Sequence, residues 1–358
     1  MLPHTDNAAA LIAQVQAAID ARSTLRLRGG GTKDFYGQAL TGELLDTTGH
    51  AGITSYEPSE LVVTARAGTS LTELETVLAA QGQCLPFEPP LFGRNATVGG
   101  MVASGLNGPA RSSVGAVRDY VLGVVLVNGK AETLTFGGQV MKNVAGYDVS
   151  RLMTGAMGTL GLLLEVSLKV LPVPPAEATL LFEMDEGSAL RQLNRWGGQP
   201  LPVNASCWQD GRLWVRLRGA VAAVAAAQIT MGGQRLGEES GVFWAALREQ
   251  AVPFFECAPG ESLWRLSLPD TAAPMDLGTT LIEWGGAQRW LKRSSADADL
   301  LRRAAAAVGG HATLFRSDDK SVPVFTPLKS PLDRIHRDLK TQFDPHGIFN
   351  PGRMSAER

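Results

Sequence analysis

The chain has 358 residues, of which 44% are hydrophobic and 19% charged, so a large apolar core is available and wholesale disorder is not expected. Its formal net charge of −2 gives no electrostatic reason to expect nucleic acid or an anionic membrane as a partner. The first residues lack a signal-peptide pattern and no apolar run reaches the ~20 residues that span a bilayer, so we expect a cytoplasmic protein without a transmembrane segment.

The cysteines and histidines show no metal-binding spacing. Cys84, Cys207 and Cys257 are far apart and form no CxxC pair, and the five histidines form no HxH or HExxH pattern. We therefore expect no metal site, and an iron–sulfur cluster would have to come from another chain.

The first half is expected to mix helices and strands without regular alternation. An amphipathic helix is indicated by Leu11, Ile12, Val15 and Ile19, and Ser70 with Glu73 forms a capping box that opens a second helix. A hairpin is indicated by Asn128-Gly129 between two apolar runs. The expected strands are residues 24–28, 61–67, 120–127, 131–136 and 162–171. This order favours an α+β fold over a doubly wound sheet.

A proline-rich segment, residues 171–175 (LPVPP), cannot continue a helix or a central strand and is the expected domain boundary. Residues 176–325 are expected to form a smaller domain of sheet plus helices. Its clearest signals are an alternating strand at residues 212–218 and helices at residues 221–228 and 296–308.

The first motif that carries chemistry is RGGGTK, residues 28–33. Three adjacent glycines would destabilise a helix or strand, whereas in a loop their bare backbone amides can surround an anion. The motif is neither a Walker loop nor a Rossmann fingerprint, which argues against ATP and nicotinamide cofactors. By itself a glycine triplet also fits a plain flexible turn.

The second motif is NATVGGMVASG, residues 95–105. We expect Thr97 to cap a short helix whose first turn, with Gly99 and Gly100, offers free amides to a phosphate. A glycine-rich contact between helices is an equally good interpretation of this motif alone.

The third motif joins KNVAGYD, residues 142–148, to GAMGTLG, residues 155–161, just before a strand. Main-chain groups at such a turn can face a flat heterocycle. Taken alone, an ordinary glycine-rich connection is the better interpretation.

In this order, the three motifs resemble the FAD-binding domain of the vanillyl-alcohol oxidase (PCMH-type) flavoprotein family. The C-terminal FDPHGIFNPGR, residues 343–353, resembles the ending of the family's 2-hydroxy-acid dehydrogenase branch. Residues 263–269 and 282–292 are similar to the FAD-binding subunits of bacterial glycolate oxidases. The resemblance covers residues 20–175 and the last ~15 residues well, and four ordered motifs are more specific than any one of them.

The resemblance implies an α+β fold with three parts. These are a PCMH-type FAD-binding domain of two α/β subdomains (1–175), a cap domain on the substrate side (176–325) and a C-terminal segment that returns to the flavin (326–358). The implied FAD contacts are Arg28, Gly29, Gly30, Gly31, Thr32, Lys33, Pro90, Thr97, Gly99, Gly100, Ala103, Ser104, Gly105, Lys142, Tyr147, Gly158, Thr159, Gly161, Leu163 and Asn350.

Departures from the family pattern bear on chemistry. Family members that hold flavin covalently often carry histidine directly after the loop glycines, where this chain has Thr32, so non-covalent FAD is expected. The HxGDGNxH-like metal motif of catalytic relatives is missing. A cation must still hold the substrate carboxylate, for which Arg265, Arg289 and the Arg212, Arg216 and Arg218 face are candidates, although such a strand face is more often solvated or interfacial. Tyr147 is a further catalytic candidate.

Three functions remain open from the sequence. The resemblance implies an FAD-binding subunit that takes electrons from a small 2-hydroxy acid such as glycolate, alongside a larger flavin subunit and an iron–sulfur subunit. The alternatives are a self-sufficient FAD-dependent oxidase of a hydroxy acid or alcohol, and a flavin-loaded structural subunit without turnover.

Overall fold

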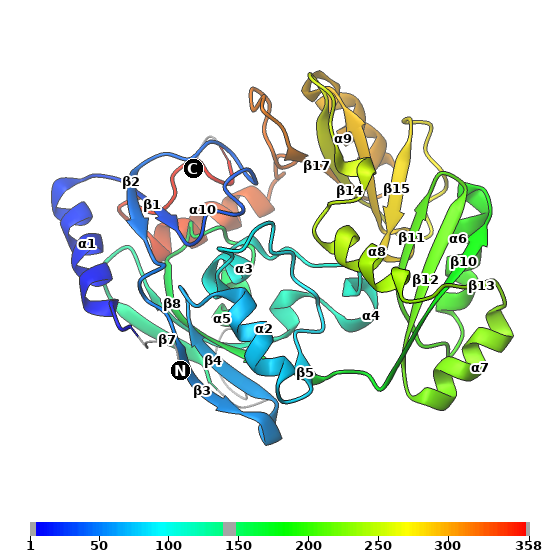
Figure 1. Cartoon of the computed structure of the whole chain (residues 1–358). Coiled ribbons are helices and arrows are strands. Elements are labelled where there is room, and N and C mark those ends of the chain that lie inside the picture. The colour runs from blue at the N-terminus through cyan, green and yellow to red at the C-terminus, as the bar shows by residue number, and fades with distance from the viewer. Residues whose placement is uncertain (1–4, 139–147, 356–358) are drawn as a thin grey trace. The chain divides into compact units, whose positions relative to one another are not determined.

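The computed structural model describes residues 5–138 and 148–355. These residues form two compact units that are coloured along the chain in Figure 1. Unit 1 comprises the described residues 5–106, 116–138, 148–172 and 327–355. Unit 2 comprises residues 107–115 and 173–326, so a short segment from the first half of the chain groups with the second unit.

Unit 1 is built on a five-stranded antiparallel sheet with the order β3-β4-β8-β6-β7. A parallel pair, β1-β2, and a short antiparallel pair, β5-β9, complete its strands. The strands are β1 (Leu25–Arg28), β2 (Glu43–Asp46), β3 (Ile53–Glu57), β4 (Val62–Arg66), β5 (Gln83–Cys84), β6 (Val121–Val127), β7 (Thr133–Gly137), β8 (Leu162–Lys169) and β9 (Leu171–Pro172). The helices are α1 (Ala8–Ala21), α2 (Leu71–Ala79), α3 (Val98–Ser104), α5 (Val149–Met153) and α10 (Leu332–Phe343).

The expected helices and strands of the first half are confirmed to within a few residues. The amphipathic helix is α1, which buries Leu11, Val15 and Ala18 against strand residues and against Ile348 and Phe349 from the C-terminal segment. In Figure 1 this segment, in red, runs beside the blue β1 and β2. The core of unit 1 therefore joins the two ends of the chain.

Unit 2 is an eight-stranded antiparallel sheet with the order β13-β10-β12-β11-β15-β16-β14-β17. Its strands are β10 (Ala176–Glu183), β11 (Val203–Gln209), β12 (Arg212–Gly219), β13 (Gln234–Arg235), β14 (Ser262–Ser267), β15 (Thr280–Glu283), β16 (Gln288–Arg293) and β17 (His311–Arg316). Its helices are α4 (Arg111–Val114), α6 (Glu186–Gly197), α7 (Val221–Met231), α8 (Glu239–Arg248) and α9 (Ala298–Ala307).

The sheet of unit 2 consists of two similar halves. The first half runs β10-α6-β11-β12-α7-β13 with the spatial order β13-β10-β12-β11, the ferredoxin-like arrangement. The second half, β14-β15-β16-α9-β17, has the matching order β17-β14-β16-β15 but no helix between its first two strands. Separate apolar clusters lie in the two halves, and β11 pairs with β15 at their junction.

Candidate flavin site

Two neighbouring hollows in unit 1 are lined by the sequence motifs. They enclose about 550 and 560 Å³ of empty space, part of it open to solvent. Because the hollows have several lining residues in common, they are two lobes of one cavity. The shared residues are Leu27, Arg28, Gly29, Gly100, Ala103, Met157 and Asn350.

The glycine loop after β1 presents a row of open amides. Among the described residues, no acceptor bonds to the backbone N–H groups of residues 29–32, and these residues line the second lobe. Gly31 has φ +72°, a left-handed conformation that glycine adopts without strain. Successive amides with one such residue form a concave site for an anion. This arrangement suits a diphosphate.

Two of these glycines are also required by the protein itself. A Cβ atom on Gly29 would lie 2.3 Å from Oγ1 of Thr97, and one on Gly30 would lie 1.5 Å from the carbonyl oxygen of Asn95. The first and second motifs are therefore packed against each other. A side chain at Gly30 would displace the chain at Asn95 before it could fill the cofactor space.

The first turn of α3 does not offer the free amides that the sequence predicted. The amides of Val98 and Gly99 donate to carbonyl oxygens within segment 67–69, at 2.9 and 2.8 Å. The amide of Gly100 donates to the capping Oγ1 of Thr97 at 3.2 Å. The predicted cap is confirmed, but the predicted phosphate contact through these amides is wrong because the protein already uses them. Gly99 and Gly100 contribute to the cavity as surface without side chains.

Charged side chains border the glycine loop. Arg28 donates from Nε to the carboxylate of Asp34 at 2.7 Å, and its guanidinium lies over Gly31. Lys33 donates to the carbonyl oxygen of Leu91 at 3.2 Å, and its ammonium lies 5.7 Å from the centre of the Phe92 ring. The cations thus reach the lobe that holds the open amides, where they favour a negatively charged ligand.

The third motif meets the second at the end of α3. The amides of Gly155 and Met157 donate to the carbonyl oxygens of Val102 and Ala103, at 2.9 and 2.8 Å. A Cβ atom on Gly105 would lie 3.0 Å from the Cα atom of Gly155. The close contact between these glycines joins the second and third motifs, and the turn delivers Gly158, Gly161 and Leu163 to the first lobe.

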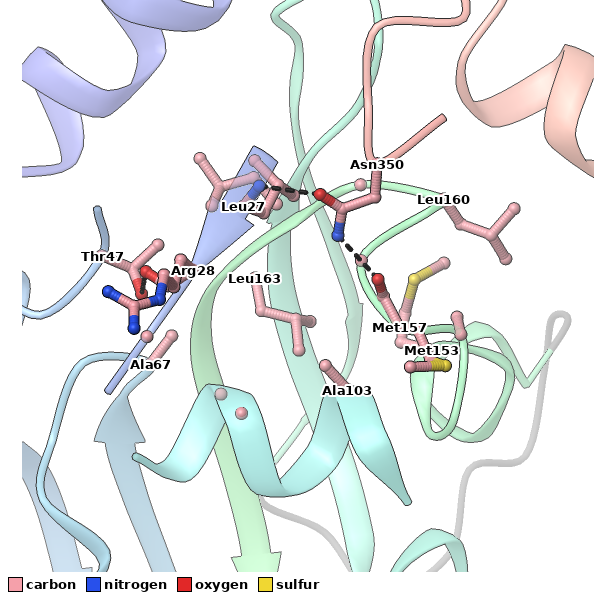
Figure 2. A pocket seen from close by; sticks show the side chains of 17 residues that line it. Leu27, Arg28, Thr47, Ala67, Ala103, Met153, Met157, Leu160, Leu163 and Asn350 are labelled. Atoms are coloured by element: carbon pink, nitrogen blue, oxygen red, sulfur yellow. Dashed lines mark hydrogen bonds between the residues drawn. The ribbon is translucent and has the colours of Figure 1, made fainter. Parts of the chain in front are cut away.

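Asn350 ties the C-terminal segment to the cavity wall. Its Oδ1 accepts from the backbone N–H of Leu27 at 2.8 Å, and its Nδ2 donates to the carbonyl oxygen of Met157 at 2.7 Å, as Figure 2 shows. Its own amide donates to the carbonyl oxygen of Leu25 at 2.9 Å. Asn350 therefore lines both lobes while joining β1 to the third motif.

Not all of the remaining predicted FAD contacts line the two lobes. Ser104 lines the second lobe. Thr159 lines a third hollow, beside α10, which shares Ala156, Leu160 and Asn350 with the first lobe. Its carbonyl oxygen accepts from Nζ of Lys340 at 2.7 Å. Pro90 is buried and lines neither lobe. Lys142 and Tyr147 lie outside the described residues.

The residues of the cavity fit FAD. Open amides and nearby cations occupy the second lobe, matching a diphosphate. The first lobe is mainly apolar, with Ala67, Met153, Leu160 and Leu163 beside Leu27, and it suits a heterocycle or a ribose edge (Figure 2). Both requirements of a dinucleotide are thus met within unit 1.

Comparison with known proteins identifies the family. Residues 4–150 match a family model described as an FAD binding domain. Over all 358 residues the chain is 50% identical to glycolate oxidase subunit GlcE of Escherichia coli strain K12, and the match covers 100% of both chains.

The chain belongs to the GlcE family.

Other relatives share only part of their length with this GlcE-family chain. Glycolate oxidase subunit GlcD of Bacillus subtilis is 31% identical over 156 residues, or 43% of this chain and 33% of that protein. A D-lactate dehydrogenase of Anaerostipes hadrus is 34% identical over 141 residues, or 39% of this chain and 29% of that protein. The chain thus spans about a third of these two proteins. It is an FAD-dependent oxidoreductase, as the resemblance implied.

A solved structure shares the fold of this GlcE-family chain. Alkyldihydroxyacetonephosphate synthase aligns with a TM-score of 0.65 at 15% identity, covering 98% of this chain and 75% of that one. The predicted α+β class with a PCMH-type FAD-binding domain is confirmed. Within residues 5–138 and 148–355, no helix has the length and apolarity to cross a membrane.

The arginines proposed for catalysis lie in unit 2 and differ in burial. Arg289 is 1% exposed, and its guanidinium donates to the carbonyl oxygens of Ala272, Ala273 and Gly286. These bonds, with the carboxylate of Glu186 3.9 Å away, give Arg289 a structural role and argue against its assignment to the substrate carboxylate. Arg265 on β14 is half-buried, with its guanidinium 5.4 Å from the centre of the Phe315 ring.

The arginine face of β12 is partly covered: Arg212 is exposed, Arg218 is half-buried and Arg216 is buried. Arg216 is 2% exposed, donates to Oδ1 of Asn204 at 2.8 Å and lies 5.0 Å from the ring centre of Trp244 on α8. Arg218 pairs with Glu177 on the adjacent strand. Their position in the sheet accounts for both charges without a substrate.

Sequence reasoning missed several residues of the cavity. Thr47, Ala67 and Met153 line it but lie outside the three motifs, whereas Met157 lies in the third motif and was not among the predicted contacts. Arg353 also lines it and follows directly after the Asn-Pro-Gly of the C-terminal motif. The motifs were therefore a usable signal for Arg353 and Met157, whereas Thr47, Ala67 and Met153 are distinguished only by their burial.

Proposed function

We propose that this chain is the FAD-binding subunit of a glycolate-oxidising complex and that it passes electrons from the 2-hydroxy acid, through FAD, to an iron–sulfur cluster on a partner subunit. The observation that carries the proposal is the 50% identity to GlcE over the full length of both chains. A cavity whose residues suit FAD supports it.

The reaction divides between cofactor and chain. Oxidation of glycolate to its 2-oxo acid releases two electrons and two protons, and bound FAD supplies the acceptor for the electron pair. The amides of residues 29–32 bind the diphosphate, and apolar residues such as Leu163 exclude water from the first lobe. The proton acceptor is not assigned to any residue.

Partners complete the proposed complex. The three cysteines of this chain are too widely spaced for a cluster motif, which supports a separate iron–sulfur subunit. A larger flavin subunit is the second proposed partner, and the complex acts in the cytoplasm. The similarity of this chain to GlcD, itself named a glycolate oxidase subunit, supports related flavin subunits working together.

The flavin is proposed to be non-covalent. Thr32, half-buried after the loop glycines, has a hydroxyl that cannot form the histidyl–flavin bond of covalent relatives. Acid precipitation of the yellow protein should release intact FAD into the supernatant. Flavin that stays with the precipitate would contradict this.

Activity measurements separate the proposed function from its alternatives. The chain is purified alone and with its native partners, and both samples are assayed with glycolate and related hydroxy acids, using oxygen or an artificial electron acceptor. Activity that requires the partners supports the proposal. Activity of the isolated chain with oxygen would instead indicate a self-sufficient oxidase. Full activity of a complex whose flavin cavity in this chain is blocked would indicate a structural subunit.

Arg265 is the candidate that we retain for binding the substrate carboxylate. Its half-buried guanidinium is less solvated than a surface arginine, which strengthens its attraction for an anion. In the active complex, Arg265→Met should raise KM for glycolate by roughly 10- to 100-fold, the loss expected for a charged hydrogen bond, with FAD content unchanged. An unchanged KM would remove Arg265 from the site.

A further inference from the structure

Arg353, three residues after Asn350, reaches back to the far part of the glycine loop. Its guanidinium donates to the carbonyl oxygens of Asp34, at 2.9 Å, Lys33, at 3.4 Å, and Gln38. Its own carbonyl oxygen accepts from the amide of Gln38 at 3.0 Å. The side chain and the backbone of Arg353 thus both bind a loop that is more than 300 residues away in the sequence.

The charge of Arg353 is buried, and no carboxylate of residues 5–138 or 148–355 is bonded to it. The residue is 5% exposed, and its hydrogen bonds within the described chain go to backbone carbonyl oxygens. The carboxylate of Asp34, whose charge acts on Arg353, already accepts from Nε of Arg28 at 2.7 Å. Burial lowers the pKa of Arg353 to about 10, so the side chain is still cationic at neutral pH.

Arg353 also lines the lobe that contains the open amides. Lining residues of this lobe run from Gly29 to Asp34 and include Arg353 itself. The carbonyl oxygens that Arg353 binds, at Lys33 and Asp34, directly follow the amides of residues 29–32 along the backbone. Holding these carbonyl oxygens limits movement of the peptide groups that come after the amide row.

We propose that Arg353 is a positioning residue for the FAD diphosphate. Its planar fork holds the carbonyl oxygens of Lys33, Asp34 and Gln38 so that the preceding amides remain directed at the cavity, and its buried charge favours an anion there. The proposal rests on the assignment of this cavity to FAD and goes beyond the predicted contacts, in which Arg353 had no role.

The experiment compares FAD affinity with the stability of the apoprotein. Arg353→Met and Arg353→Lys are made in the full chain, FAD is removed, and the FAD dissociation constant is measured by flavin fluorescence without substrate. Thermal unfolding of each apoprotein is followed in parallel. Since no turnover is measured, the result does not depend on whether the chain oxidises glycolate.

Arg353→Met should weaken FAD binding roughly 10- to 100-fold, the loss expected for charged hydrogen bonds. Arg353→Lys should recover part of this affinity, because it keeps the charge but cannot bind three carbonyl oxygens at once. Arg289→Met is the matched control: it removes a buried arginine that also donates to three carbonyl oxygens, in unit 2, and should lower stability while FAD affinity is unchanged.

Two results would overturn the proposal. One is an FAD dissociation constant for Arg353→Met within twofold of the wild type. The other is equal weakening of FAD binding by Arg353→Met and Arg289→Met, in proportion to lost stability. If Arg353→Met does not fold, Arg353→Lys decides the question, because wild-type affinity in that variant would show that the fork is not needed.

Discussion

Glycines in the FAD-binding motifs differ in what surrounds them. Gly30 and Gly100 both lie in motifs that predicted flavin contacts, yet their surroundings differ. A Cβ atom on Gly30 meets the backbone of Asn95 at 1.5 Å, whereas one on Gly100 meets only the side-chain Oγ1 of Thr97, at 3.1 Å. Gly100 is therefore the position where a side chain would enter the cavity without first displacing the backbone.

Gly100→Val should reduce FAD affinity at least ~100-fold, because loss of more than one cofactor contact corresponds to about 3 kcal/mol. FAD binding is measured by flavin fluorescence, with apoprotein unfolding as a check on folding. Gly241→Val on α8 is the control, since a Cβ atom there meets nothing within 4 Å. Wild-type FAD affinity in Gly100→Val would place the cofactor elsewhere.

His50 gives a pH dependence with a defined sign. Burial and the charge of Arg66 hold the pKa of His50 below its ordinary value, against the opposing effects of Asp6 and Glu165, and Nδ1 of His50 accepts from the amide of Asn7 at 3.2 Å. The unfolded chain therefore takes up a proton at a higher pH than the native protein, and stability falls as pH drops below about 6.5.

The comparison variant for this effect is His50→Gln, whose amide oxygen can still accept from Asn7. Between pH 7 and 5 the urea midpoint of the wild-type protein should fall more than that of His50→Gln. Parallel pH profiles for the two proteins would show that His50 does not contribute to acid sensitivity.

At the scale of elements, the predicted hairpin shows where sequence reasoning succeeds and where it stops. Strands β6 and β7 pair as Asn128-Gly129 indicated, but the turn extends to Glu132, whose carbonyl oxygen accepts from the amide of Asn128. Gly129 is needed because a Cβ atom there would lie 2.4 Å from a carboxylate oxygen of Asp344. The local pattern predicted the pairing, while a distant segment set the shape of the turn.

Asp344 organises the turn that follows α10. Its carboxylate accepts from the amides of Ile348 and Phe349, at 3.0 and 2.8 Å, and from Nζ of Lys340, which also donates to the carbonyl oxygens of Thr159 and Phe349. The side chain of Asp344 has no exposed surface. This turn directs the C-terminal segment toward β1.

Asp344→Asn should lower the free energy of unfolding by roughly 3 kcal/mol, because an NH2 group replaces one of the two accepting oxygens and the ammonium of Lys340 loses its buried counter-charge. Urea denaturation measures the change. Asp338→Asn, on the exposed side of the same helix, should have an effect below about 0.5 kcal/mol. Equal effects in the two variants would mean that the turn does not depend on the carboxylate.

At the scale of the whole molecule, the tryptophans and the flavin cavity belong to different units. All seven tryptophans lie between residues 196 and 290, in unit 2, whereas the flavin cavity lies in unit 1. Tryptophan fluorescence therefore follows unit 2 during unfolding, and calorimetry records both units.

FAD should raise the unfolding temperature of unit 1, since a ligand at 100 times its dissociation constant stabilises the folded state by about 2.7 kcal/mol. Calorimetry of the apoprotein with and without FAD measures the shift, and tryptophan fluorescence assigns the transition of unit 2. Adenosine, which lacks the diphosphate, is the control ligand and should produce a smaller shift. An FAD-independent calorimetric trace would contradict the cavity assignment.

The sequence by itself determined the class of protein. Glycine motifs in a fixed order, a capped helix at Thr97 and a C-terminal Asn-Pro-Gly were enough to predict an α+β fold and FAD, because these features act through local conformation. The two similar halves of the sheet in unit 2 were not visible, since strand order depends on pairing between distant segments and their sequences show no repeat.

Only the tertiary structure decided which backbone groups meet the cofactor. The amides at the start of α3 are taken by carbonyl oxygens of segment 67–69, whereas those of residues 29–32 stay open within the described chain. Likewise, Arg353 is separated from Lys33 by 320 positions and binds its carbonyl oxygen all the same. Whether a polar group is free or bonded depends on which distant residues folding brings next to it, and a local sequence motif does not predict those residues.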